Sequence, residues 1–357
     1  MRRGSGVRGG AAVLTVAAIV SACADRSDLP KARSSGTASP VHGQQPEQGW
    51  QPDRQGQQGQ RGQEGQQGRQ GQGRQGQGQQ GQGRQGQDGR RGQPAGPLLA
   101  APAAHALGAY AERLRRAHAA RVAAAKRWGL AKLPLLPPEP PARRPALTTR
   151  KGFEVAGHEE MGLPPVFTTV PTAHKVVFLT IDDGAEKDPA FLRMMSELKI
   201  PYTAFLSDCL IKEDYGYFKQ MRERGVALNN HTLHHRYMRA LSYDAQKREI
   251  CGMQDVIEKR YGKRPTLFRP PYGSYNRDTL RAAKTCGIKA VPLWNEEVFV
   301  DRWDYREGDR DLRPGDIVLS HFRGKGEWKG TMPDMIRHFL KLVTDKGYAV
   351  ARLEDYL

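Results

Sequence analysis

The chain has 357 residues and a formal net charge of +18, which is enough length for one large domain with appended segments. Residues 1–150 hold 23 Lys and Arg against 8 Asp and Glu, whereas residues 151–357 hold 33 against 30. Because the basic excess belongs to the first part and the second part is nearly balanced, the composition does not indicate a folded nucleic-acid-binding face.

The first residues are organised like an export signal. Arginines at positions 2, 3 and 8 precede the apolar run AAVLTVAAIV, which is too short to span a membrane comfortably. VSAC follows at residues 20–23, with small residues just before Cys23. This segment resembles the lipobox of bacterial lipoproteins, so we expect a signal peptide over residues 1–22 and a lipid on Cys23 at the outer face of the cell membrane. The alternative is an ordinary secretory signal with a chance cysteine, and both signals export the protein.

Residues 23–98 are predicted to form a disordered tether. Residues 43–97 consist almost wholly of Gln, Gly and Arg, so they have too little apolar surface to offset the entropy lost on ordering. About 55 residues of Gly-rich chain have an end-to-end span on the order of 40 Å, which would hold a domain away from a membrane. The alternative is that the tract itself binds a surface, through attraction of its arginines to anionic polymers or lipids.

An Ala-rich segment and a Pro-rich linker occupy residues 99–160. Leu107, Tyr110, Leu114 and Trp128 recur near helical spacing, which predicts one amphipathic helix over residues 99–128, docked on the domain or lying at the membrane. The segment LPLLPPEPPARRP then breaks regular structure, because proline removes backbone donors and restricts its neighbours.

From residue 161 to 357 short apolar runs such as VVFLTI, PYTAFL and DIVLSHF alternate with helical patterns. Alternation of strands and helices over about 200 residues predicts an α/β domain with a parallel sheet, open or closed into a barrel. Polar residues follow several of the strands, where parallel α/β architectures place their sites.

Two adjacent carboxylates, Asp182 and Asp183, follow the strand VVFLTI. Buried like charges repel and lose hydration, so the pair needs a solvated turn or a cation. The later segment HTLHH supplies His231, His234 and His235, and histidines at such spacing can chelate one ion with a carboxylate from another strand end as third ligand. A divalent ion would explain the acidic pair, but spacing alone leaves His234 and His235 as alternatives.

The motifs TIDDG, HTLHH, RPPYG and LSH occur in this order at residues 180–184, 231–235, 269–273 and 319–321. They resemble the motifs of the NodB-homology polysaccharide deacetylases, carbohydrate esterase family four, over about residues 170–357. The resemblance implies a distorted (β/α) barrel of the polysaccharide deacetylase type, a divalent ion such as zinc, and an enzyme that removes acetyl groups from N-acetylated sugars.

The resemblance also implies a role for each motif residue. The metal ligands would be Asp183, His231 and His235. Asp182, paired with Arg269, would be the base that takes a proton from metal-bound water, and His321 would be the acid that protonates the leaving amine. Tyr272 would donate its backbone N–H to the oxyanion, and Leu319 would line the acetyl pocket. This division suits amide hydrolysis, which needs a nucleophile at neutral pH and a protonated leaving group.

The fourth motif departs from the family pattern, in which an aspartate tunes the catalytic histidine and a tryptophan forms a wall of the pocket. The chain reads WNEEVFVDRWDY here. Glu297 or Asp301 is expected to tune His321, and Trp294 or Trp303 to form the wall, because the register is open.

Cys209, Cys251 and Cys286 remain beside Cys23. At most one disulfide can form among these three, and without CxxC spacing a thiolate metal site is not indicated. We expect each to be a small buried hydrophobic residue.

The sequence thus predicts an exported, membrane-tethered deacetylase acting on N-acetylglucosamine-type residues of a cell-wall polysaccharide, with peptidoglycan as the leading substrate and no nucleic-acid partner. The alternatives are an esterase acting on acetylated xylan or another O-acetylated polysaccharide, with a secreted form, and a non-catalytic carbohydrate-binding surface lipoprotein. A binding protein would have no need for both a base and an acid.

Overall fold

The computed structural model describes residues 101–150, 152–153, 155 and 161–357, without the side chains of residues 101–105. The expected signal peptide, the lipid-bearing Cys23 and the tether to residue 98 lie outside the described residues. None of the helices in the described part of the chain has an apolar stretch long enough to cross a membrane.

The Ala-rich segment forms helix α1, Ala101–Arg127, as the helical spacing predicts. Its C-terminal half docks, because Ala124 and Ala125 are buried and the Arg121 guanidinium donates to the carbonyls of Leu198 and Pro134. In the N-terminal half, by contrast, apolar side chains such as Leu107 stay exposed.

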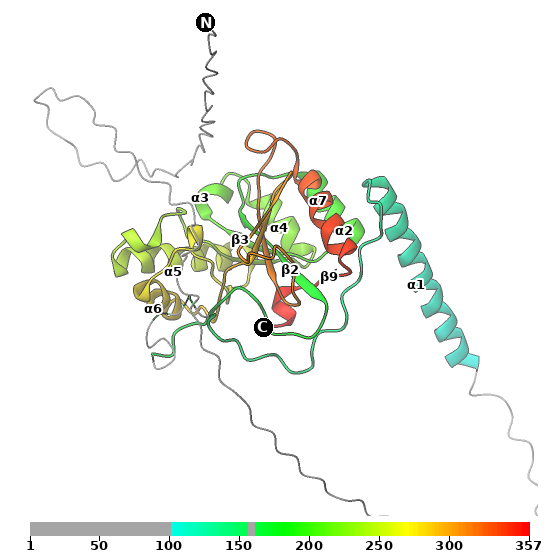
Figure 1. Cartoon of the computed structure of the whole chain (residues 1–357), viewed down its shortest axis with the longest axis horizontal. Helices are drawn as coiled ribbons and strands as arrows, with labels where there is room; N and C mark the ends of the chain where they lie inside the picture. Colours follow the sequence, from blue (N-terminus) through cyan, green and yellow to red (C-terminus); the bar gives the residue numbers. More distant parts are fainter. Residues whose placement is uncertain (1–100, 151, 154, 156–160) are drawn as a thin grey trace, which may run out of the picture. The chain divides into compact units, whose positions relative to one another are not determined.

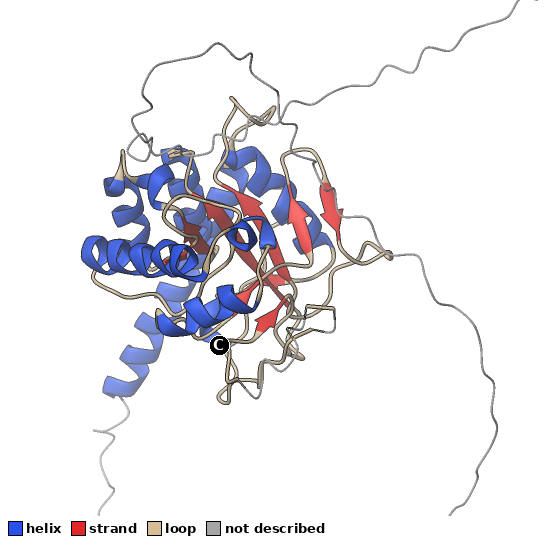
Figure 2. Ribbon diagram, turned by 90° about the vertical axis from the view of Figure 1, so that its left-hand side faces the viewer, coloured by secondary structure: helices blue, strands red, loops and turns tan. Residues whose placement is uncertain are grey.

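The core of the domain is a mostly parallel sheet with helices packed around it (Figures 1 and 2). The strands run in the order β4-β3-β2-β8-β6-β7, and β9 also pairs with β2. The pairings are parallel except for β6 with β7. Their bounds are Val176–Asp183 for β2, Thr203–Leu206 for β3, Ala227–Asn230 for β4, Glu296–Val298 for β6, Trp303–Tyr305 for β7, Ile317–His321 for β8 and Ala349–Val350 for β9.

The sheet closes irregularly into a distorted barrel. Beyond β4 the ring continues through single bridges, Asn230 with Phe268 and Leu267 with Ala290, to the two-stranded sheet of β1, Val166–Phe167, and β5, Val291–Pro292. The Ile317 N–H then donates to the Thr168 carbonyl, which joins the end of this short sheet to β8. The predicted fold class is therefore confirmed, and isolated bridges replace regular ladders on one side.

Helices cover the outside of this ring. They carry ordinary start signals, such as Asp188 capping α2 and Ser242 capping α5 through side-chain acceptors. Their bounds are Pro189–Leu198 for α2, Asp208–Ile211 for α3, Tyr215–Glu223 for α4, Tyr243–Tyr261 for α5, Arg277–Thr285 for α6 and Met332–Asp345 for α7, with short 3₁₀ turns η1 at Met238–Ala240, η2 at Pro271–Gly273 and η3 at Leu353–Asp355.

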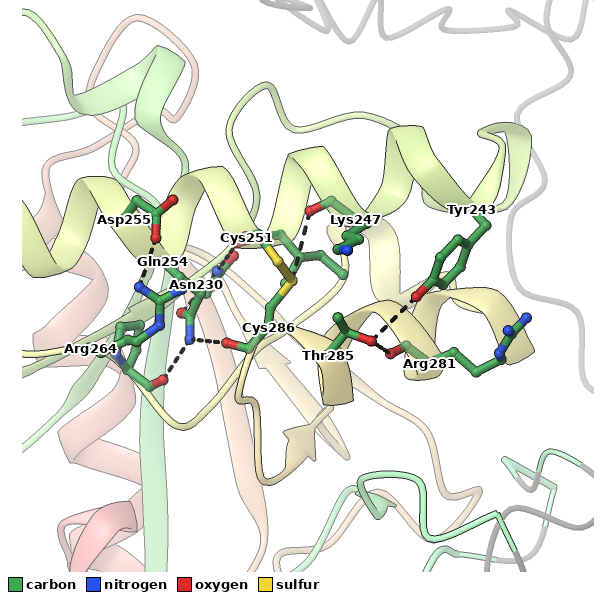
Figure 3. Close-up of a disulfide and its surroundings, with 12 residues drawn as sticks. Asn230, Tyr243, Lys247, Cys251, Gln254, Asp255, Arg264, Arg281, Thr285 and Cys286 are labelled. Carbon is green, nitrogen blue, oxygen red and sulfur yellow. Dashed lines mark hydrogen bonds and ion pairs between the residues drawn. A yellow bond between two sulfur atoms is a disulfide. The ribbon is translucent and has the colours of Figure 1, made fainter.

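A disulfide joins α5 to the end of α6, which lie side by side (Figure 3). Cys251 and Cys286 are bonded, with their Cα atoms 5.0 Å apart, and Cys209 is disulfide-bonded as well. The expectation that each of the three is an unbonded small hydrophobic residue is therefore wrong. The spacing of cysteines along the chain does not show which of them form a disulfide. Close by, the Asn230 amide donates to the Ile250 carbonyl and to Gln254, which fixes the end of β4 against α5.

Candidate metal centre and its surroundings

The predicted motif residues meet at one end of the barrel because parallel strands end there together. In the register of β2 with β8, Asp182 lies opposite His321. Six residues other than glycine have a positive φ in the described chain, and four of them belong to these motifs: Asp183, Thr232, His235 and Tyr272. Such backbone conformations cost of order 1–3 kcal/mol each and cluster at functional sites.

Glycine at position 184 is required by both conformation and space. Its φ is +95°, and a Cβ there would lie 2.5 Å from the Ile211 Cγ2. The sharp turn that this glycine permits directs the chain away from β2 directly after the two aspartates.

Asp183, His231 and His235 form the one group of metal-ligating side chains found among the described residues. Their candidate ligand atoms all lie within 4.8 Å of one another. The Asp183 Oδ1 is 3.1 Å from the His235 Nε2 and 3.5 Å from the His231 Nε2. This oxygen is buried and accepts no hydrogen bond. The three candidate ligand atoms are thus arranged around a common point, as the ligands of one metal ion are.

The tautomer of His231 suits ligation. Its Nδ1 is 2.7 Å from the Arg269 carbonyl oxygen, and a carbonyl only accepts, so Nδ1 carries the hydrogen and the Nε2 lone pair is directed to the centre. The backbone N–H of His235 donates to the Thr232 hydroxyl. This hydrogen bond, between two residues of the HTLHH motif, stabilises the turn that positions His235.

The other oxygen of Asp183 is occupied. Arg323, which follows the LSH motif, places its Nη2 2.7 Å from the Asp183 Oδ2. Burial alone would raise the pKa of Asp183, but His231 and His235, together with the charge of His321, hold that pKa well below its ordinary value. Asp183 is therefore ionised and offers only Oδ1. Arg323 was not predicted from the sequence. The only signal for it there is a basic residue two positions after the LSH motif.

Asp182 has its own cation. The Arg269 Nη1 donates to the Asp182 Oδ1 at 2.8 Å, and both side chains are buried. The rest of the guanidinium donates to the carbonyls of Pro292 and Leu293. Each of the three guanidinium nitrogens thus donates at least one hydrogen bond, as a buried arginine requires. The group orients the carboxylate that lies 3.7 Å from the His231 Nε2.

His321 contacts the third carboxylate of the site, with its Nδ1 3.3 Å from the Glu297 Oε1. Burial would lower the pKa of His321, but Glu297 and the charges of Asp183 and Asp182 outweigh it and raise the pKa to about 9. His321 is therefore a proton donor at neutral pH. Asp301 is exposed and lies near Arg302 instead, so of the two residues that sequence register left open, Glu297 is the one beside His321.

The two candidate tryptophans lie in different places. Trp294 packs beside the RPPYG motif, where a Cβ on Gly273 would come within 2.9 Å of its ring. Trp303 stacks on Phe339 of α7, with ring centroids 5.9 Å apart, and belongs to the core cluster. Trp294 is therefore the tryptophan at the site, and Trp303 does not reach it.

Leu319 and Tyr272 complete the predicted set. Leu319 is buried on β8, on the same face as His321 because residues two apart in a strand share a face. The Tyr272 ring lies 4.9 Å from the His235 ring and is half exposed. Tyr272 is the central residue of η2 and has a left-handed backbone conformation.

His234 points away from the centre. Its Nδ1 and its backbone N–H contact the two oxygens of Glu249 on α5, each at 2.8 Å. Glu249 is buried and was not singled out from the sequence. This pair anchors the histidine turn to α5, and the alternative left open by spacing is settled geometrically in favour of His235.

The donor set fits a divalent transition metal. Two imidazole nitrogens and one monodentate carboxylate oxygen make three protein ligands, the number found in catalytic zinc sites that keep a position open. The unpartnered, buried Asp183 Oδ1 is the observation that favours a cation, because an ionised oxygen without a partner is costly to bury.

Comparisons with known proteins agree with this geometry. Residues 169–291 match the family model described as polysaccharide deacetylase. An uncharacterised protein of Streptomyces coelicolor is 42% identical over 196 residues, covering 55% of this chain and 78% of that protein. The peptidoglycan-N-acetylmuramic acid deacetylase PdaC of Bacillus subtilis is 31% identical over 56% of this chain, which spans only 42% of PdaC.

Another relative is also covered over most of its length. A peptidoglycan-N-acetylglucosamine deacetylase of Bacillus cereus is 29% identical, over 49% of this chain and 82% of that protein. Among solved structures, the Bc1960 peptidoglycan N-acetylglucosamine deacetylase superposes with a TM-score of 0.50 at 21% identity, covering 57% of this chain and 97% of that one. At this identity the likeness concerns the fold alone.

Proposed function

Because the chain belongs to the polysaccharide deacetylase family, carbohydrate esterase family four, we propose that it removes N-acetyl groups from N-acetylglucosamine-type residues of a cell-wall polysaccharide. Peptidoglycan is the substrate we put first. The Bacillus relatives named above carry peptidoglycan in their names, and the chain shares with them the family of their catalytic domains.

The proposed roles follow from the contacts. Asp182, hydrogen-bonded to Arg269, is the base that accepts the proton of the attacking water. His321, protonated beside Glu297, donates a proton to the amine nitrogen, which leaves poorly as an anion. The Tyr272 backbone N–H is the proposed donor to the oxyanion, and Leu319 with Trp294 is proposed to surround the acetyl group.

A metal is proposed at Asp183, His231 and His235, and zinc suits these ligands best. A divalent ion held there would lower the pKa of a bound water towards about 7, which would supply a nucleophile at neutral pH. The second oxygen of Asp183 is occupied by Arg323, so the chain's own geometry favours monodentate ligation.

Export is part of the proposal. The disulfide between Cys251 and Cys286 is the kind of bond that persists in oxidising compartments outside the cytosol. The proposed substrate, peptidoglycan, also lies outside the cytosol. A lipid anchor on Cys23 and a tether over residues 23–98 would keep the domain near the envelope, and metabolic labelling with a lipid precursor tests the anchor.

The observation that carries the proposal is the combination of a three-ligand centre with a base and an acid beside it. The experiment is acetate release by the purified chain from peptidoglycan fragments and, in parallel, from acetylated xylan, after chelation and after metal is restored. We expect release from peptidoglycan that is lost on chelation and recovered with zinc. Hydrolysis that is indifferent to chelation contradicts the metal-dependent function, and release from xylan alone contradicts the substrate.

A further inference from the structure

Two exposed tyrosines stand beside the metal centre. From residue 161 onward, Tyr237 and Tyr272 are the only large apolar side chains of the described residues that are highly exposed, at 48% and 53%. Single exposed hydrophobic residues are ordinary on protein surfaces. Here, however, the two such residues of the domain lie next to each other and next to a candidate ligand.

The rings form a continuous surface. The centroids of Tyr237 and Tyr272 are 6.3 Å apart, with the ring planes inclined by 46°. The Tyr272 ring lies 4.9 Å from the ring of His235, whose ring in turn lies 4.9 Å from that of His231. The aromatic surface therefore begins at the metal centre and extends outward from it.

The backbone under both rings is fixed. Tyr237 precedes η1, where its carbonyl accepts from the Ala240 N–H and its neighbour Met238 is completely buried. Tyr272 is held in a left-handed conformation by the turn that packs on Trp294. Two tyrosines on rigid supports offer apolar area to a ligand at little cost in conformational entropy.

We propose that Tyr237 and Tyr272 form a binding site for the hexopyranose unit next to the sugar that is deacetylated. A pyranose ring presents an apolar C–H face and polar edges, and a tyrosine presents an apolar ring with a hydroxyl that stays in water, so the two surfaces are complementary. This inference rests on the proposed function, and it adds which two side chains bind the neighbouring sugar of the polysaccharide.

The chemistry of the surroundings favours a glycan over a protein partner. A protein interface needs an apolar core of several residues, whereas the exposed, charged side chains of Arg236 and Arg239 flank Tyr237 in the chain. A small aromatic surface with polar neighbours matches one sugar ring in size.

The test compares glycan lengths in the Tyr237→Ala variant of the full chain. N-acetylglucosamine oligomers of one to five units are titrated against a chain that also carries Asp182→Asn, so that binding is measured without turnover. We expect the dissociation constant for the pentamer to rise about three- to tenfold, the size of one aromatic contact, and the effect on the monomer to be smaller. In the active chain the same change raises KM for the pentamer and acts little on kcat.

Controls separate this inference from folding and from the proposed function. Tyr237→Phe and Tyr237→Trp keep an aromatic ring and are expected to keep pentamer binding. Tyr110→Ala, at an equally exposed tyrosine on α1, is expected to have no effect. Equal weakening for the monomer and the pentamer, or no weakening, overturns the inference while acetate release by the unaltered chain still supports the proposed function.

Discussion

The same sheet carries two pairs of neighbouring buried carboxylates, and they differ in every partner. Asp182 and Asp183 lie at the end of β2. Glu296 lies at the start of β6, and Asp316 directly precedes β8. In the first pair each carboxylate has an arginine within 2.8 Å, Arg269 for one and Arg323 for the other.

The second pair is surrounded by uncharged donors. Asp316 accepts from the Thr169 hydroxyl, the Asn295 amide and the backbone N–H of Arg313. Burial, together with Asp316, raises the pKa of Glu296 to about 9. Glu296 is therefore protonated at neutral pH, beside the carboxyl group of Asp316.

The difference shows what distinguishes a candidate metal centre from a structural carboxyl pair. Burial and a place on the sheet are common to both pairs. Only the first has an arginine on each carboxylate, and only the first is faced by the Nε2 atoms of two histidines. An ionised acid with an unpartnered oxygen attracts a cation, whereas an acid that has kept its proton does not.

The largest expected effect comes from replacing the base. Asp182→Asn keeps the shape of the side chain but cannot accept a proton, so we expect kcat to fall by about 10²–10⁴-fold. The matched control is Glu296→Gln, the same acid-to-amide change in the other pair, which is expected to stay close to full activity. Acetate release measured on both variants decides, and equal losses would show that the two pairs do not differ in function.

The next effect concerns the arginine on Asp183. Arg323→Gln removes the charge that occupies Oδ2, which frees the carboxylate to rotate, and we expect zinc affinity to fall about 10- to 100-fold, as for other residues that orient a ligand. Competition with a chromophoric chelator measures this affinity. Arg302→Gln, at an exposed arginine that lies near Asp301 and Asp304, is the control, and unchanged affinity in the Arg323 variant would contradict the role.

The third effect is a shift in pH dependence. His321 must be protonated to act as the acid, so activity is lost as pH rises through its pKa. Glu297 raises that pKa, so Glu297→Gln lowers it and we expect the alkaline limb of the kcat profile to move down by about one unit. Asp301→Asn is the control at the residue that does not contact His321. A limb that stays in place would remove Glu297 from the acid's environment.

The smallest effect on activity is expected for Glu296→Gln, which instead changes how the stability of the fold depends on pH. The folded pKa of Glu296 lies above the ordinary value of 4.5, so the unfolded chain releases a proton that the folded chain keeps. The free energy of unfolding therefore falls as pH rises from about 4.5 to 9. Glu296→Gln removes this contribution, and we expect its Tm to decrease less than that of the unaltered chain between pH 5 and pH 9. If Tm depends on pH in the same way in the variant and in the unaltered chain, Glu296 is ionised in the folded protein.

Sequence predicted the centre better than its surroundings. The strand ends and motifs placed Asp182, Asp183, His231 and His321 together, because parallel strands end at one side of a barrel and position along the chain then implies proximity. Arg323 could not be predicted in this way, since its contact with Asp183 depends on how the loop after β8 folds back.

The fourth motif shows the limit of register. From Trp294 to Tyr305 the chain forms β6 and β7, an antiparallel pair. The first half of this segment contacts the site through Glu297, and the second half packs on α7 through Trp303. The short spacing between the candidate residues cannot show which half of the segment contacts the site. The bond between Cys251 and Cys286 was missed for a similar reason, because the packing of α5 on α6 sets it.

Quantitative zinc binding by the purified chain tests the central proposal most directly. We predict one ion per chain for the unaltered protein and for Asp182→Asn, and none for His231→Ala at the same concentrations. Absence of tight binding in the unaltered chain, or equal loss in both variants, would contradict a centre built from Asp183, His231 and His235.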